Sequence, residues 1–287
     1  MTDRAPDDHI PTRLLVMGMA GQDGSIVASE VEPVAEACGQ TREQVRAELA
    51  LIVDEGLFAT EDGDRYSPTP AGRAFLDSAL ERARLAYVQD AAGRGWDRRW
   101  HLVAVAPVDD ESVAAFVRRL FALGAGQIQN GLYVSPHSWE SVVTAEAERL
   151  GVADAVTTAV TDELEIGGER DPRTLAGRLW ALDDLARRYQ GFIERYKEVP
   201  EALTDMRSRQ ERLTEAEFLA GALTTVIDFE ACFSRDPLLP PELLPRPWPG
   251  REARELVNRG RRLGVLARER HERPALFSLF EEVIDRL

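Results

Sequence analysis

Two arginines one helical turn apart carry the most informative chemistry in this sequence. Arg42 and Arg46 lie on the polar side of a helix that the capping box Thr41-Arg42-Glu43-Gln44 predicts to begin at Thr41. A guanidinium can donate two hydrogen bonds to the O6 and N7 atoms of a guanine, and Thr41 or Gln44 could bind a phosphate or an adenine edge. These four side chains are therefore candidates for contacting duplex DNA.

Three helices and a hairpin would position these side chains. The helices carry apolar stripes at helical spacing, the two strands flank an Asp-Gly turn, and Thr69-Pro70 begins a longer helix. This order predicts a winged helix-turn-helix over residues 1–92, in which the second helix of the pair enters the major groove and Arg65 and Arg73 could contact phosphates. The expected elements are helices over 11–20, 29–38 (from a capping box at Ser29) and 41–56, strands over 57–60 and 65–67, and a helix over 70–89.

The rest of the chain divides into a mixed segment and a helical one. Apolar periodicity over residues 93–167 follows β-α-β-β-α-β logic and predicts a ferredoxin-like sandwich, with the stretch 127–135 read as a single strand and one strand unassigned. Residues 168–287 are predicted to be all helical. We therefore expect an α+β protein of three domains. The expected helices of the last domain are one from Asp171-Pro172 to about Tyr196, then 214–233, 252–268 and 274–287.

Net charge is the main argument against a DNA partner. The chain has 35 Lys and Arg against 50 Asp and Glu, and its first ninety residues hold eight Arg and no Lys against seventeen acidic residues. Phosphate neutralisation by basic side chains supplies most non-specific affinity for DNA. A sensor or protein-interaction module that does not bind DNA therefore stays open as an alternative, with the polar residues of the third helix serving only as its solvated face.

Enzymatic and metal sites find little support. The four histidines are scattered, and Cys38 and Cys232 lie far apart without further metal ligands nearby, so we expect no disulfide, metal or cofactor. Ser135 and His137 lack a third group to orient a base. An acyl-CoA or RNA-processing enzyme, the latter using Asp109 and Asp110, remains the less favoured alternative. The acidic N-terminus and the absence of long apolar runs predict a cytoplasmic protein without a membrane segment.

Three runs of the chain stand out as specific motifs. They are Trp180-Ala181-Leu182-Asp183-Asp184-Leu185-Ala186-Arg187-Arg188-Tyr189, the proline-rich stretch from Ser234 to Gly250, and Gly131-Leu132-Tyr133-Val134-Ser135-Pro136-His137. These runs resemble the PaaX family, the repressors of bacterial phenylacetic-acid degradation. The hairpin ends in Thr69-Pro70-Ala71-Gly72-Arg73, which is similar to the family's Thr-Pro-x-Gly-Arg entry to the next helix. The resemblance covers about residues 11–270.

This resemblance implies a homodimeric repressor of a catabolic operon that binds an operator and is released by an aryl-CoA or related aromatic metabolite. An effector site is expected between the middle domain and the C-terminal helices, with Trp100, Trp180 and Arg188 as its candidate residues. The chain departs from the family where His-Glu-Trp-Arg-Arg is replaced by Ile227-Asp228-Phe229-Glu230-Ala231. Because that change removes the histidine and both arginines, it implies an effector that differs from the family's own ligand.

Overall fold

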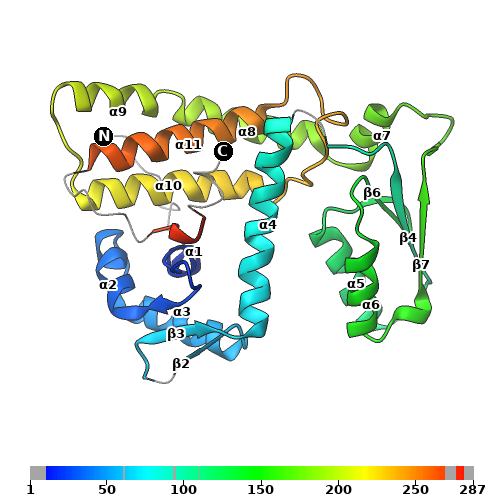
Figure 1. Ribbon diagram of the computed structural model, residues 1–287, viewed down its shortest axis with the longest axis horizontal. Coiled ribbons are helices and arrows are strands. Elements are labelled where there is room, and N and C mark those ends of the chain that lie inside the picture. The colour runs from blue at the N-terminus through cyan, green and yellow to red at the C-terminus, as the bar shows by residue number, and fades with distance from the viewer. Residues whose placement is uncertain (1–10, 61, 93–94, 109, 269–275, 281–287) are drawn as a thin grey trace. The chain divides into compact units, whose positions relative to one another are not determined.

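The computed structural model describes residues 11–60, 62–92, 95–108, 110–268 and 276–280. It is a mixed α/β structure with two antiparallel sheets, as expected for an α+β protein (Figure 1). The chain forms two compact units, each assembled from separated segments. The first contains Met1–Leu85, Gln190–Ala231 and Arg251–Leu287, and the second contains Ala86–Tyr189 and Cys232–Gly250.

The N-terminal part of the first unit has the predicted order of helices and hairpin. It also contains a short strand, β1, which pairs antiparallel with β3 and extends the hairpin to three strands in the order β1-β3-β2. The elements are α1 (Thr12–Gly18), β1 (Ile26–Val27), α2 (Ala28–Ala37), α3 (Arg42–Asp54), β2 (Phe58–Thr60), β3 (Arg65–Pro68) and α4 (Pro70–Ala92), the last of which continues into the second unit.

The core of the first unit draws on distant parts of the chain. Val45, Leu49 and Ile52 form the predicted stripe on α3 and are fully buried. They belong to one hydrophobic cluster with Phe218 of α10 (Glu215–Phe233) and with Leu276. Helix α3 is therefore packed in one core with residues that follow it by more than 150 positions in the sequence.

The second unit contains a four-stranded sheet with the strand order β5-β6-β4-β7, in which every pairing is antiparallel. Helices α5 and α6 lie side by side against one face (Figure 1), where Phe116 and Val143 pack on Val103 and Tyr133. The element order is the predicted β-α-β-β-α-β. The bounds are β4 (Trp100–Val105), α5 (Glu111–Ala122), β5 (Gly126–Gln129), β6 (Leu132–Ser135), α6 (Glu140–Arg149), η1 (Ala153–Ala155) and β7 (Val156–Thr161).

The prediction of a single strand over residues 127–135 is wrong. Strands β5 and β6 are joined by a turn at Asn130-Gly131, where Gly131 has a φ of +78°. A Cβ atom at this glycine would lie 2.8 Å from the carbonyl oxygen of Val105. Both the positive φ and this close approach therefore require glycine at the turn. The Asn-Gly pair is a hairpin signal, and it supplies the strand that the sequence reading left unassigned.

The helical segment also differs in detail from the prediction. The long helix expected from Asp171 to Tyr196 is broken at Trp180, whose φ of −127° and ψ of 143° are those of extended backbone. Helix α9 was not predicted, whereas the helix over 214–233 is confirmed as α10 with its Thr214–Glu217 capping box. The bounds are α7 (Pro172–Leu179), α8 (Leu182–Tyr196), α9 (Val199–Ser208) and α11 (Pro249–Ala267).

The final predicted helix, over 274–287, lies largely outside the described residues, which there contain only the short turn η2 (Ser278–Phe280). Within the described part of the chain, no helix is both long and apolar enough to cross a membrane. The division of the chain at residues 92 and 167 stays a prediction.

Candidate nucleic-acid interface

Thr41 and Gln44 form the predicted capping box at the start of α3. The Thr41 hydroxyl accepts from the Gln44 backbone N–H at 3.2 Å, and the Gln44 side-chain oxygen accepts from the Thr41 backbone N–H at 2.7 Å. The box satisfies two amides that the first turn of a helix leaves without partners. It also fixes both side chains at the N-terminus of α3, next to Arg42.

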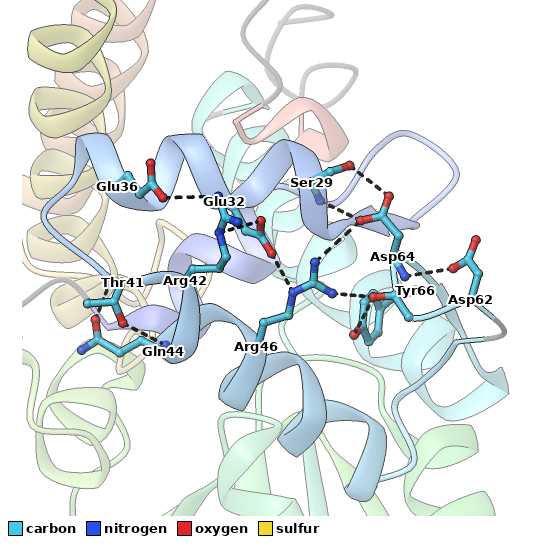
Figure 2. A network of polar contacts seen from close by, with 11 residues as sticks. Ser29, Glu32, Glu36, Thr41, Arg42, Gln44, Arg46, Asp62, Asp64 and Tyr66 are labelled. Atoms are coloured by element: carbon cyan, nitrogen blue, oxygen red, sulfur yellow. Dashed lines mark hydrogen bonds and ion pairs between the residues drawn. The ribbon is translucent and has the colours of Figure 1, made fainter.

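The two arginines of α3 share one glutamate on α2 (Figure 2). Glu32 lies between them, accepting from Nε of Arg46 at 2.6 Å and forming an ion pair with Nε of Arg42 at 3.1 Å. The Glu32 side chain is only 9% exposed, whereas those of Arg42 and Arg46 are 62% and 43% exposed. The carboxylate is thus buried beneath two guanidinium groups that still reach solvent.

Arg46 also ties α3 to the turn of the hairpin. Its guanidinium donates to the carbonyl oxygen of Gly63 at 2.5 Å and lies 4.0 Å from the Asp64 carboxylate. Asp64 in turn accepts from the backbone N–H and the hydroxyl of Ser29, both at 2.9 Å. The network in Figure 2 therefore links α2, α3 and the hairpin through charged side chains.

The predicted capping box at Ser29 is wrong. Helix α2 begins at Ala28, and Val27 at its N-cap position makes no side-chain cap. The Ser29 hydroxyl is instead used by Asp64 of the hairpin, 35 residues along the chain. A tertiary hydrogen bond has replaced the local one that the sequence pattern suggested.

The remaining two arginine candidates have different environments. Arg65 on β3 is half exposed and binds the Asp23 carboxylate at 2.7 Å and the Ser25 hydroxyl at 2.7 Å. Arg73 is exposed on the first turns of α4, and in the described part of the chain it forms no ion pair. Of the four arginines, Arg73 is therefore the one whose charge is least compensated nearby.

Glu32 was predicted to belong to the capping box at Ser29, and its pairing with the two arginines was missed, although a signal for that pairing exists. It lies four residues after Ala28 and three before Ala35, on the stripe of α2 that the structure buries. A carboxylate on a buried stripe requires a charged or hydrogen-bonding partner, because burying it alone is costly. The partners are the arginines that were singled out for DNA, so this surface is neutralised within the protein itself.

Comparisons with known proteins match the middle and the C-terminal part of the chain to one family. The family model described as "PaaX protein central Cas2-like domain" matches residues 93–176, and that described as "PaaX-like protein C-terminal domain" matches residues 180–271. Together the two matches cover more than half of the chain. The chain belongs to the PaaX family. The relationship predicted from the runs at 131–137, 180–189 and 234–250 is thus confirmed.

One relative and one solved structure are also similar to this chain. The Transcriptional repressor PaaX of Escherichia coli (strain K12) is 26% identical over 244 residues, which are 83% of this chain and 74% of that protein. The Uncharacterized protein Rv0674 from Mycobacterium tuberculosis is 21% identical, with coverage of 90% of this chain and 94% of that chain and a TM-score of 0.48.

In this member of the PaaX family, the three predicted effector residues do not share one environment. Trp100 and Trp180 lie in one hydrophobic cluster on the sheet face opposite α5 and α6, where Trp100 is 1% exposed. The Trp180 indole N–H donates to the carbonyl oxygen of Gly124 at 3.0 Å. Arg188 pairs with Asp184 one turn earlier on the exposed side of α8, at 2.8 Å. Both tryptophans thus serve as packing residues, and their assignment to an effector site stays a prediction.

The residues considered for catalysis have structural partners. The Ser135 hydroxyl accepts from the His137 backbone N–H at 3.1 Å, and Nε2 of His137 lies 2.8 Å from the carbonyl oxygen of Leu238. Asp110 caps α5, while Asp109 lies outside the described residues. Among the described residues, no group of three His, Cys, Asp or Glu could hold a metal ion.

The pH dependence of the free energy of unfolding tests whether His137 is buried as described. Burial lowers its pKa, although the hydrogen bond to Leu238 acts in the opposite direction. The unfolded chain then takes up this proton near pH 6.5 while the folded chain resists it, so the free energy of unfolding should fall as the pH drops below about 6.5. The amide of a His137→Gln variant can still donate to Leu238 but does not titrate. We therefore expect this variant to lose less stability than the wild type between about pH 7 and pH 5, a range that spans the ordinary pKa of histidine. Urea unfolding across this range checks it, and parallel pH profiles for the two proteins would contradict it.

Proposed function

We propose that this chain is a transcription regulator that binds duplex DNA through a winged helix-turn-helix formed by α1 to α4. The observation that carries the proposal is the position of Arg42 in a PaaX-family chain, at the exposed N-terminus of the second helix of the α2–α3 pair. In helix-turn-helix proteins, the N-terminal residues of this helix contact base edges. The name of the Escherichia coli relative supports the same function.

The six DNA-contacting candidates have distinct proposed roles. Arg42 and Arg46 read bases, Arg65 and Arg73 contact phosphates, and Thr41 and Gln44 bind a phosphate or an adenine edge. The Arg42–Glu36 and Arg65–Asp23 pairs are exposed and oppose binding only weakly, since exposed pairs contribute about 0–1 kcal/mol and can be exchanged for a phosphate. Both Arg42 and Arg46 also pair with the mostly buried Glu32 carboxylate. Arg46 is held more closely, at 2.6 Å against 3.1 Å, and also donates to the Gly63 carbonyl oxygen, so its contribution to DNA binding is the smaller.

The wider assignment follows the family. The chain acts as a homodimeric repressor in the cytoplasm, its second unit contains a ferredoxin-like sandwich with no catalytic role, and a small aromatic metabolite relieves repression. Two-fold symmetry matches a palindromic operator. The segments 1–92, 93–167 and 168–287 are the proposed domains in this arrangement.

The proposal predicts salt-dependent binding to the DNA upstream of the chain's own gene. If Arg65 and Arg73 each neutralise one phosphate, affinity per chain should fall roughly tenfold or more between about 50 and 200 mM salt. Fluorescence anisotropy with the upstream duplex and a shuffled duplex of equal length measures this effect, and sedimentation of the complex counts the chains per duplex. Equal binding of both duplexes, or none at the lowest salt, rules the proposal out.

A protein-interaction module is the second candidate function. Glu32 and Asp64 neutralise the surface that DNA would occupy, and the chain carries a net charge of −15. Under this alternative, the upstream duplex would fail to bind even at low salt while α3 contacts another protein. The anisotropy experiment separates the two functions.

A further inference from the structure

The first unit contains a cavity that none of the sequence candidates line. It has a volume of about 470 Å³ and is bounded mainly by α9, α10 and α11, together with Tyr196 at the end of α8, Leu213, Leu276 and Phe277. These three helices run beside one another in Figure 1. Cavities that hold small molecules typically measure roughly 300 to 1,000 Å³, so this one has the size of a binding site.

Glycines contribute to the space. Gly221 on α10 and Gly260 on α11 both line the cavity, and a Cβ atom built at either position meets no atom within 4 Å. Glycine in the interior of a helix costs roughly 0.5–1 kcal/mol relative to alanine. Glycine at these two positions therefore lowers the stability of the helices but leaves the volume between them open.

The wall of the cavity is suited to an apolar molecule. The hydroxyls of Thr224 and Thr225 donate to carbonyl oxygens of their own helix, each at 2.8 Å, and the Tyr196 hydroxyl donates to Asp228 at 2.7 Å. Burial, reinforced by the Asp228 carboxylate, raises the pKa of Tyr196, which keeps this hydroxyl protonated. The polar groups nearest the cavity are thus already used within the protein.

The charge of the lining also limits the ligand. Arg261 is the only basic residue among the described lining residues, and most of the others are aliphatic or aromatic. A ligand with several phosphates, such as a CoA thioester, would need several cations or backbone N–H groups to replace its hydration. The cavity therefore fits a ligand without phosphate groups.

The cavity wall belongs to the core that supports α3. Phe218 and Leu276 line the cavity and are also members of the cluster that contains Leu49 and Ile52. Phe277, another lining residue, donates its backbone N–H to the carbonyl oxygen of Gly18 at the end of α1. A molecule in the cavity would press on residues that pack beneath the DNA-contacting helix.

We propose that this cavity binds a small, mainly apolar molecule, aromatic or branched aliphatic and without phosphate groups, and that its occupancy alters the packing of α1 and α3. The effect on α1 and α3 is regulatory only if the proposed DNA-binding function holds. A protein partner is not the occupant we infer, because a specific protein interface buries at least about 1,000 Å² in total and this site is a hollow between helices.

Binding can be tested with N-phenyl-1-naphthylamine, a neutral apolar dye whose fluorescence rises in apolar surroundings. The wild-type chain should bind it saturably, and the double variant Gly221→Leu, Gly260→Leu should bind at least about tenfold more weakly because the leucines occupy the ligand's volume. The matched control is Gly191→Leu on α8. Gly191 likewise has no atom within 4 Å of an added Cβ but does not line the cavity.

Each outcome decides the proposal. Loss of dye binding in the double variant but not in Gly191→Leu supports the site, provided circular dichroism shows that all three proteins are folded. If the double variant is unfolded, the single variants Gly221→Leu and Gly260→Leu take its place. Absence of saturable binding to the wild type, equal binding to all variants, or displacement of the dye by free coenzyme A overturns it.

Hydrogen exchange separates the site from its regulatory effect. Bound dye should slow amide exchange in peptides that contain residues 12–20 and 276–280, which meet at Phe277 and Gly18. Protection confined to α9, α10 and α11 would overturn the link to the DNA-contacting helices and leave the site standing. Neither measurement uses DNA, so a failure of the proposed DNA-binding function would appear separately in the anisotropy experiment.

Discussion

Replacing Gly72 by alanine should lower the free energy of unfolding by about 3 kcal/mol or more. A Cβ atom at this position would lie 1.8 Å from the carbonyl oxygen of Leu57 and 2.8 Å from its carbonyl carbon. The first turn of α4 cannot retreat easily, because the Thr69 hydroxyl donates to the carbonyl oxygen of Gly56 at 2.6 Å and its backbone N–H donates to that of Leu57 at 3.0 Å. Urea unfolding followed by circular dichroism measures the loss.

Gly191→Ala is the matched control for this substitution. Gly191 is also a helical glycine of the first unit, and an added Cβ meets no atom within 4 Å. It should stabilise the protein by up to about 1 kcal/mol, because alanine favours the helix. A Gly72→Ala variant as stable as the wild type would show that Leu57 and α4 do not approach as closely as described.

Replacing Arg42 by alanine should weaken binding to the operator by roughly 1–3 kcal/mol and relax the preference for one base pair. Arg42 is the most exposed arginine of the network in Figure 2, and its second ion pair, with Glu36, is long at 3.7 Å. Arg65→Ala should instead weaken all sequences about equally and reduce the salt slope by about one. Anisotropy with the operator and with single base-pair variants distinguishes the two effects.

Glu32→Gln completes this experiment. Without the carboxylate, the surface around Arg42 and Arg46 carries one negative charge fewer, so affinity for any duplex should rise and the salt slope should steepen by about one. Arg84→Ala serves as the control, since Arg84 forms an exposed ion pair with Glu81 on α4, away from this network. Unchanged DNA affinity for Arg42→Ala and Glu32→Gln alike would favour the interaction module.

The parts of the fold that were predicted from the sequence depend on local signals. The capping box at Thr41 and the apolar stripe on α3 lie within thirteen residues of one another, and both are present. The break between α7 and α8 has no such signal. There Trp180 leaves the helix and its indole binds Gly124, 56 residues earlier in the chain, which is a tertiary contact.

The sequence predicted which side chains gather at the candidate site but not the acidic residues that pair with them. Arg42, Arg46, Thr41 and Gln44 gather at the N-terminus of α3 as expected. Their acidic partners come from α2 and the hairpin, and only the fold brings these together. Sequence spacing cannot show that Glu32 faces Arg46 fourteen residues later, although the position of Glu32 on a buried stripe indicates that some partner must exist.

The shared core of the first unit has a consequence for synthesis on the ribosome. Leu49 and Ile52 pack in one cluster with Phe218 and Leu276, so this core stays incomplete until all of these residues have been translated. Leu276 follows Ile52 by 224 residues, which at roughly 5–20 residues per second take about 11–45 s to translate. During that interval the apolar face of the nascent α3 lacks its late partners, and a chaperone that shields such a face would act on the first unit before α1, α2 and α3 are fully packed.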